Sequence, residues 1–430
     1  MTSRDDSAGQ SPAPSTRFPT AIFLFAFFGW AFDFYDLVLL GFLKDAVARD
    51  LHLSHAAESW LLGAGLGASG IGGLVAGALA DRVGKRAVLS ATVGVYSLGS
   101  LICGLAPSGA VFFAGRIVQG IGVGGEWAIG HGMLAESVAP ATRGRAAAAL
   151  QSGEPVGVAL AALVGYLVLP RVGWRMVLIG SSATALLAVA ARASVHLPAA
   201  RAAARPYLQE VRQAFRTAGL PRRFAAAWVL GVFKLGTYWS CYTWLPSFLS
   251  AGMHQSIGRS LAWMVTAQLG QLVGMMTFGV VSDRVGRRPA FAAYSLLTAL
   301  AVGALALRWH ALLGHPPLFW VVMLGLGVGS GCTAGFGALL AELYPTEVRG
   351  AAMGATYNLA RSAQLLAPVV VAAAVARAGL GGGLAVPCIL ALATAGWVWV
   401  LPETRGIELP ALDRPPRAGR LDPPGVSLRR

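Results

Sequence analysis

The chain has 430 residues, of which 56% are hydrophobic and only 12% are charged, and its mean hydropathy is +0.62. Soluble domains carry about twice that share of charged residues, so the composition excludes a soluble globular protein and indicates many membrane spans. The net charge of +15 comes from short Lys and Arg clusters between apolar runs, which excludes a basic nucleic-acid-binding domain. The four cysteines lie inside apolar runs without paired spacing, so we expect neither a disulfide framework nor a metal site.

Twelve apolar runs are each long enough for a helix that spans a bilayer, which needs about 20 residues. Residues 1–17 before them are polar and rich in proline and serine, and we interpret them as a disordered cytosolic tail. The first run is too long for a signal peptide, and no small-residue cleavage site follows it. The sequence therefore predicts an all-α membrane protein with twelve transmembrane helices. The predicted spans are 18–43, 57–80, 87–106, 110–135, 146–169, 174–197, 223–249, 259–281, 289–309, 317–340, 350–376 and 381–401.

The distribution of Lys and Arg indicates the orientation of the chain. With the N-terminus in the cytosol, the cytosolic segments hold 24 Lys and Arg residues and the outer segments hold seven, with three more inside spans. Cytosolic loops of membrane proteins carry such an excess of positive charge, so both termini are expected in the cytosol. The chain has 31 Arg and only 3 Lys, which is typical of a GC-rich bacterial genome. We therefore expect a multi-pass protein of the bacterial inner membrane.

A ten-residue segment occurs twice, after the second and after the eighth span. Residues 77–86 read GALADRVGKR and residues 279–288 read GVVSDRVGRR, an offset of 202 residues. A second, shorter pattern is also repeated: a Glu stands seven residues before an Arg-Gly pair, once after the fourth span and once after the tenth. Repeats of this kind build transporters whose binding site lies near the bilayer midplane, between the two halves. The predicted domains are a six-helix half at 18–197, a basic cytosolic linker at 198–222, a second six-helix half at 223–401 and a cytosolic tail at 402–430.

The doubled segment, together with PETRG at 402–406, resembles the major facilitator superfamily over residues 18–406. The resemblance implies two pseudo-symmetric six-helix halves that alternate access to a central site. In that family such loops form a charge latch between helices that holds one access state closed, and glycine permits the tight turn. The alternative is a plain anchor of positive charge on the cytosolic side. The expected latch residues are Gly77, Asp81, Arg82, Gly84, Arg86, Asp283, Arg284, Gly286 and Arg287.

Three further segments narrow the resemblance. FDFYD at 32–36, GRIVQGIGVGGEW at 115–127 and YNLAR at 357–361 are similar to the sialate, metabolite and aromatic-acid proton symporter group. The resemblance implies uptake of organic carboxylates together with protons. Phe34 stands where aromatic-acid symporters usually have glycine, and this chain lacks the extra central spans of the sialate transporters. The resemblance therefore favours the simpler monocarboxylate carriers.

Seven charged residues lie inside the predicted spans, away from their ends, and each costs about 2.5–3.5 kcal/mol at a helix centre unless it has a partner or a use. Asp33 and Asp36 are three residues apart and share a helix face, so repulsion between two ionised carboxylates favours binding of a proton. Structural ion pairs and packing contacts are the alternative. The proton-coupling candidates are Asp33, Asp36, Glu126 and Glu154.

The three cations inside the spans, Arg116, Lys234 and Arg361, are suited to a substrate carboxylate. Lys234 lies among aromatic and polar side chains, and Lys234 and Arg361 are the favoured anion-binding residues. Arg116 can instead form a structural ion pair. Tyr357 lies four residues before Arg361 and so shares its helix face. The remaining substrate-binding candidates are Asn358, Tyr238 and Gln268.

These observations predict a proton-coupled symporter that carries a small organic anion, with a monocarboxylate favoured, by alternating access. A proton-driven exporter of drugs or metabolites is one alternative, because the same loops serve both directions of transport. An uptake carrier for sugars or polyols is another, since the PETRG segment at 402–406 also resembles sugar carriers. We expect no cofactor, no metal and no enzyme activity, since no nucleophile–base or metal-ligand spacing occurs. The expected partners are the anion, protons and lipid, without nucleic acid, and the expected state is a monomer.

Overall fold

Every regular element in the described part of the chain is a helix. The computed structural model describes residues 20–137, 146, 149–184, 216, 219–249, 257–344 and 349–405. The predicted all-α fold is confirmed. The predicted tail at 1–17, most of the predicted linker at 198–222 and most of the tail at 402–430 lie outside the described residues.

The described helices fall into two groups along the sequence. The first bundle contains α1 (Thr20–Asp50), α2 (His55–Val83), α3 (Lys85–Gly104), α4 (Gly109–Gly124), α5 (Glu126–Ser137), α7 (Gly153–Leu163), the π-helix η2 (Val164–Val168), α8 (Leu169–Ser181) and η3 (Ser182–Thr184). The second bundle contains α11 (Leu220–Ser247), α12 (Ile257–Val285), α13 (Arg287–Gly314), α14 (Pro316–Ser330), η5 (Gly331–Thr333), α15 (Ala334–Leu343), α16 (Arg349–Ser362), η6 (Ala363–Leu366), α17 (Ala367–Trp397) and η7 (Val398–Val400).

Eight stretches of the described chain are helical, long and apolar enough to cross a membrane. Two of them hold two predicted spans each, because Gly173 (φ 76°) interrupts Ala149–Ser181 and Gly379 (φ 67°) interrupts Ala352–Val400. The other two predicted spans correspond to α4 with α5, where the helix is interrupted at Gly125, and to α11, which is less apolar. Each predicted span therefore has a helical counterpart in its described part, while residues 185–197 of the predicted span 174–197 lie outside the described residues.

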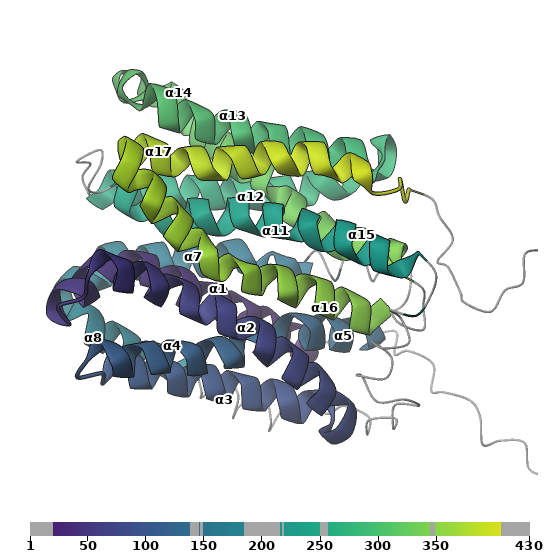
Figure 1. Ribbon diagram of the computed structural model, residues 1–430, viewed down its shortest axis with the longest axis horizontal. Helices are drawn as coiled ribbons and strands as arrows, with labels where there is room; N and C mark the ends of the chain where they lie inside the picture. Colours follow the sequence, from purple (N-terminus) through teal and green to yellow (C-terminus); the bar gives the residue numbers. More distant parts are fainter. Residues whose placement is uncertain are drawn as a thin grey trace, which may run out of the picture.

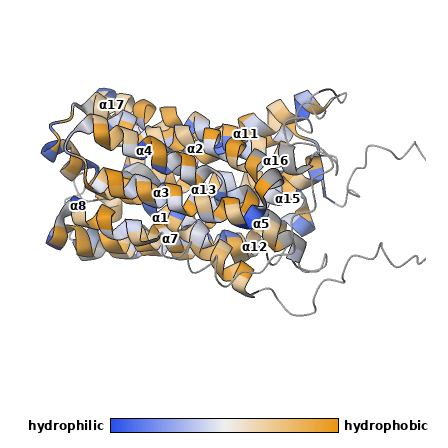
Figure 2. Cartoon of the chain, turned by 90° about the horizontal axis from the view of Figure 1, so that it is seen from below, coloured by the Kyte–Doolittle hydropathy of each residue, from blue (hydrophilic) through white to orange (hydrophobic). Residues whose placement is uncertain are grey.

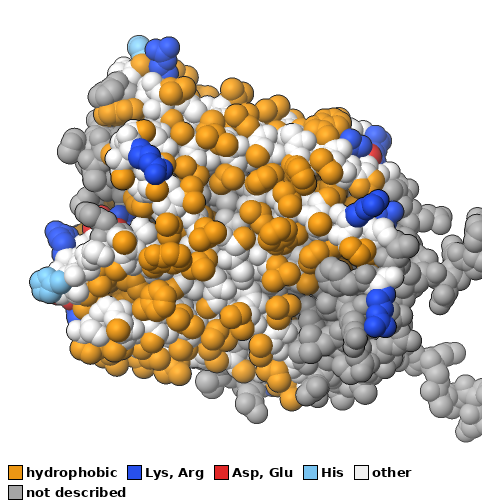
Figure 3. Space-filling view, in the orientation of Figure 1, with side chains coloured by type: hydrophobic (Ala, Val, Ile, Leu, Met, Phe, Trp, Pro, Cys, Tyr) orange, Lys and Arg blue, Asp and Glu red, His pale blue; other side chains and the backbone are white. Residues whose placement is uncertain are grey.

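The two bundles lie side by side, with their helices along the long axis of the molecule. Figure 1 shows the first bundle in purple and blue and the second in teal to yellow. Apolar residues prevail along the helices in Figure 2, and in Figure 3 they cover the middle of the surface while Lys and Arg gather toward the ends. The most exposed large side chains include Leu307 (82%), Leu300 (72%) and Met276 (70%). An apolar belt of this kind is the surface that lipid covers.

The bundles meet along several helices: α1 contacts α11, α7 and η2 contact α12, α2 contacts α16, η6 and α17, and α5 contacts α16. The approach of α2 depends on glycine, because a Cβ atom on Gly70 would overlap the Ser362 hydroxyl and one on Gly73 would overlap the Asn358 amide. Ser362 Oγ also donates a hydrogen bond to the carbonyl oxygen of Gly67 at 3.1 Å. This close contact brings the polar side chains of α16 against the first bundle.

Candidate functional site

All seven charged residues that were predicted inside spans are buried, and they separate into three groups. Their exposed fractions are 0% for Asp33 and Arg361, 1% for Asp36 and Glu154, 2% for Arg116, and 4% for Glu126 and Lys234. A buried charge is costly unless a partner compensates it, so the partners of each group indicate what the group can do.

The first group is centred on Arg361 in the last turn of α16, at the boundary between the bundles. Its Nε, Nη1 and Nη2 atoms have no hydrogen-bond acceptor among the described residues. Asp33 of α1 and Glu126 of α5 lie close enough for their charges to act on Arg361, yet both oxygens of Asp33 and Oε1 of Glu126 also lack described hydrogen-bond partners. The guanidinium lies 5.9 Å from the ring centre of Trp30, a cation–π contact. This group has hydrogen-bonding capacity that the described residues do not use.

Aromatic rings from both bundles surround this part of the molecule. Trp127 of α5 stacks on Tyr357 of α16, with ring centres 4.2 Å apart and planes at 12°. Phe34 of α1 stacks on Trp239 of α11 at 5.6 Å and meets Tyr238 edge to face at 5.7 Å. These ring pairs cross the boundary between the bundles, and Phe34 and Trp127 directly follow Asp33 and Glu126 in the chain, so planar apolar surfaces adjoin the buried carboxylates.

The second group lies entirely within the first bundle. Asp36 accepts a hydrogen bond from Ser100 Oγ at 3.2 Å, and Gln119 Nε2 donates to the same hydroxyl at 2.8 Å. Arg116 donates to the Gln119 side-chain oxygen, and its charge acts on Asp36. In this conformation Arg116 compensates Asp36 within α1, α3 and α4. The role of Arg116 in substrate binding stays a prediction.

The third group joins the two bundles through a carboxylate. Glu154 of α7 accepts hydrogen bonds from Gln151 Nε2 at 2.7 Å and from Gln271 Nε2 of α12 at 2.6 Å. Lys234 of α11 exerts its charge on Glu154 and donates to the carbonyl oxygen of Ser330 at 3.3 Å. Lys234 therefore has a hydrogen-bond acceptor within the described part of the chain, whereas Arg361 has none there.

A side chain that the sequence did not single out links the first and third groups. The Nε1 atom of Trp127 donates to Gln151 Oε1 at 3.4 Å, so a contact path runs from Tyr357 through Trp127 and Gln151 to Glu154. The sequence offered only local indications of these two residues. Trp127 follows Glu126 directly, and Gln151 precedes Glu154 by about one helical turn. Of the other candidates, Tyr238, Gln268 and Asn358 are buried at 3%, 3% and 1% exposure.

The doubled loop builds an ion-pair cluster at one end of the second bundle. Arg287 donates to both oxygens of Glu342 at 2.8 and 3.2 Å and to Asp283 Oδ1 at 2.6 Å. Thr404 Oγ1 donates to Glu342 at 2.5 Å. Gly286 has φ 106°, a conformation that favours glycine, and so permits the turn that places Arg287. The predicted latch residues Asp283, Gly286 and Arg287 thus meet α15 and the chain after the last span.

The matching loop of the first bundle is described only in part. Gly84 has φ 90° and ends α2, as Gly286 ends α12. The side chains of Asp81 and Arg82 lie outside the described residues. Gly77 lies in α2 one turn before Asp81, Arg86 is the second residue of α3, and Arg284 lies in the last turn of α12. The proposed latch in this bundle stays a prediction.

Glu403, within the PETRG segment, has a shifted acid–base equilibrium. Burial alone would raise the pKa of its carboxyl group from the ordinary value of 4.5, but backbone N–H groups of Arg287, Arg288, Arg405 and Thr404 donate to it and lower the pKa. A lowered pKa in the folded state means that the ionised carboxylate stabilises the fold above about pH 4.5. That contribution is lost as the pH falls through the lower value of the folded protein.

We expect Glu403→Gln to lower the melting temperature at pH 7 by roughly 2–4 °C, because charge-assisted hydrogen bonds become neutral ones. The difference from the unchanged protein should shrink as the pH falls from 5 to 3.5. Differential scanning fluorimetry in detergent measures both values. Asp283→Asn is the comparison, since its carboxylate is 68% exposed and should contribute less. An equal difference at all pH values would contradict the assignment.

Comparison with known proteins supports a single family. The family model described as Major Facilitator Superfamily matches residues 20–267 and 252–423. A Cupriavidus pinatubonensis protein named "Probable 4-methylmuconolactone transporter" is 30% identical over 393 residues, covering 89% of this chain and 90% of that protein. The niacin transporter of Acinetobacter baylyi is 25% identical over 420 residues, covering 89% and 94%. The crystal structure of a D-xylose-proton symporter has a TM-score of 0.72 at 20% identity, covering 91% of this chain and all of that one, and shows the shared fold. The chain therefore belongs to the major facilitator superfamily, alongside its metabolite and aromatic-acid transporters.

Proposed function

We propose that this protein is a proton-coupled symporter of a small organic carboxylate, with a monocarboxylate as the favoured substrate. The observation that carries the proposal is Arg361, a fully buried guanidinium with no hydrogen-bond acceptor among the described residues. A planar guanidinium suits a carboxylate because it can donate two parallel hydrogen bonds. Relatives named for niacin and for 4-methylmuconolactone, both organic acids, support this substrate class.

Coupling to protons follows from competition for one positive charge. Arg361 is shared by Asp33 and Glu126 when no substrate is present. A substrate carboxylate that binds Arg361 adds a third negative charge, so one protein carboxylate must take up a proton to keep the net charge of the buried group unchanged. Anion binding and proton binding then favour each other by the same factor. Sugar uptake is the second candidate, since the xylose symporter shares the fold. A neutral sugar, however, would offer the Arg361 guanidinium no charged acceptor.

The arrangement in the membrane is inferred from charge. The excess of Lys and Arg in alternate loops supports two six-helix halves, joined by residues 198–222, with both termini in the cytosol. The relatives are bacterial, which supports the inner membrane. We propose a monomer that works by alternating access.

The test is a thermal-shift comparison of acids with their neutral amides. Benzoate and nicotinate are compared with benzamide and nicotinamide, and with xylose, at pH 5.5 and 7.5. The carboxyl groups of both acids are ionised at both pH values, and benzoate has no other titrating group. A change with pH in the effect of benzoate therefore reports a group on the protein. We expect stabilisation by at least one acid, larger at pH 5.5, and none by its amide. Equal stabilisation by the amide, or stabilisation by xylose alone, would refute the carboxylate assignment.

A further inference from the structure

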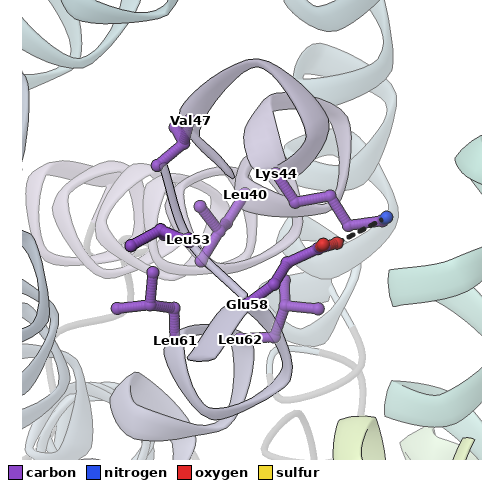
Figure 4. Close-up of a pocket in the computed structure, with 7 residues that line it drawn as sticks. All are labelled: Leu40, Lys44, Val47, Leu53, Glu58, Leu61 and Leu62. Atoms are coloured by element: carbon purple, nitrogen blue, oxygen red, sulfur yellow. Dashed lines mark hydrogen bonds and ion pairs between the residues drawn. The ribbon is translucent and has the colours of Figure 1, made fainter. Parts of the chain in front are cut away.

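Lys44 lies at the end of the molecule where α1 passes into α2, far from the buried charges already described. Its side chain is only 7% exposed. The Nζ atom lies 2.7 Å from Asp45 Oδ1 and 2.8 Å from Glu58 Oε1 at the start of α2. Figure 4 shows Lys44 and Glu58 pointing toward each other at the edge of a small hollow. The other residues that line the hollow are apolar: Leu40, Val47, Leu53, Leu61 and Leu62.

The same ammonium group also contacts the second bundle. Nζ lies 4.9 Å from the ring centre of Trp244 near the end of α11, which is a cation–π contact. Asp45 and Glu58 belong to the first bundle, as Lys44 does. The two carboxylates can therefore hold the ammonium in place in any arrangement of the bundles, whereas the contact with Trp244 exists only while α1 and α11 lie together at this end.

We propose that Lys44, held by Glu58 and Asp45 and seated on Trp244, is a gate that keeps this end of the transporter closed. Glu58 and Asp45 act as positioning residues, because they fix the ammonium over the ring. By the distribution of positive charge, this end faces outward. The proposal rests on the alternating access proposed above, but it does not depend on the nature of the substrate.

The size of the effect follows from the type of contact. A cation–π contact changes an equilibrium by a factor of about 2 at exposed sites and by a factor of about 30 when it is desolvated. The Lys44–Trp244 contact exists only in the closed state, so its full free energy changes the ratio of open to closed molecules. The burial of Lys44 places the expected factor in the upper part of that range.

The experiment measures the opening of this end directly, without substrate. Spin labels are placed at Leu105→Cys, which is 63% exposed, and at His315→Cys, which is also exposed, one in each bundle at the same end. Half-buried Cys388 and the three buried cysteines, Cys103, Cys241 and Cys332, are replaced by alanine so that only the two introduced cysteines react. Pulsed electron paramagnetic resonance in nanodiscs then gives the populations of short and long distances. Lys44→Met should raise the ratio of long to short distances by about 10- to 30-fold.

Three further variants separate the gate from a general effect of charge or folding. Trp244→Leu should produce the same shift from the other bundle, and the double variant should add little, because both changes remove one contact. Arg49→Met is the matched control, since Arg49 is an exposed cation on the same end of α1 whose described hydrogen bond is to its own helix.

If Lys44→Met lowers the melting temperature but leaves the distances unchanged, the ion pair only holds α1 against α2 and the proposal is wrong. An equal shift in Arg49→Met would also overturn it. Because no substrate is present, failure of the carboxylate assignment would leave this result standing.

Discussion

Replacing Arg361 with glutamine should abolish measurable binding of the carboxylate that stabilises the unchanged protein. Glutamine keeps a hydrogen-bond donor but removes the charge and the planar fork. Loss of one partner from a buried charge pair costs about 2–5 kcal/mol, so the dissociation constant should rise at least about 30-fold. Isothermal titration or thermal shift at pH 5.5, with the acid identified by the amide comparison, measures the change.

Two controls decide whether the loss reports the guanidinium itself. Arg361→Lys keeps the charge without the bidentate geometry, and we expect it to retain part of the affinity. Arg377→Gln removes an exposed arginine from α17 and should leave binding unchanged. If Arg361→Gln folds, by its melting temperature and its elution as a single species, and still binds the acid normally, Arg361 is not the anion site. Lys234→Gln then tests the other predicted cation.

The fold could be predicted because a bilayer imposes a simple requirement on sequence. Every span needs about 20 apolar residues, and the runs are separated by loops whose charge alternates. The breaks at Gly173 and Gly379 fall between predicted spans, although the helices continue on both sides of each glycine. The extension of α1 to Asp50 was not predicted, because the end of an apolar run marks the edge of the membrane and not the end of the helix.

The identities of the buried charges could be predicted, but their grouping could not. Asp33 and Asp36 share a helix face by their spacing, yet Asp33 lies with Arg361 whereas Asp36 lies with Ser100 and Arg116. The grouping depends on which neighbouring helix faces each turn of α1, and sequence spacing within one helix carries no such information. The contact of Glu154 with Gln271 is of the same kind, since the two residues are 117 positions apart and belong to different bundles.

Replacing Asp33 with asparagine should remove the pH dependence of anion binding. Two carboxylates act on Arg361. Both oxygens of Asp33 are buried without hydrogen-bond partners among the described residues, whereas of Glu126 only Oε1 is, so Asp33 is the better candidate for binding the proton. If one proton is taken up with each anion, affinity in the unchanged protein should fall by up to about tenfold per pH unit above the range where Asp33 is protonated. Asparagine mimics the protonated form, so affinity at pH 8 should rise toward the value that the unchanged protein shows at pH 6.

The direction of this change separates coupling from damage. A variant that merely perturbs packing would bind more weakly at every pH, whereas loss of a competing negative charge should strengthen binding at high pH. In proteoliposomes, Asp33→Asn should still exchange labelled for unlabelled acid but should no longer accumulate acid against a gradient. Asp50→Asn, at the exposed end of the same helix, is the matched control and should behave as the unchanged protein does. If Glu126→Gln removes the pH dependence while Asp33→Asn preserves it, the proton that accompanies the anion is bound by Glu126 of α5 and not by Asp33 of α1.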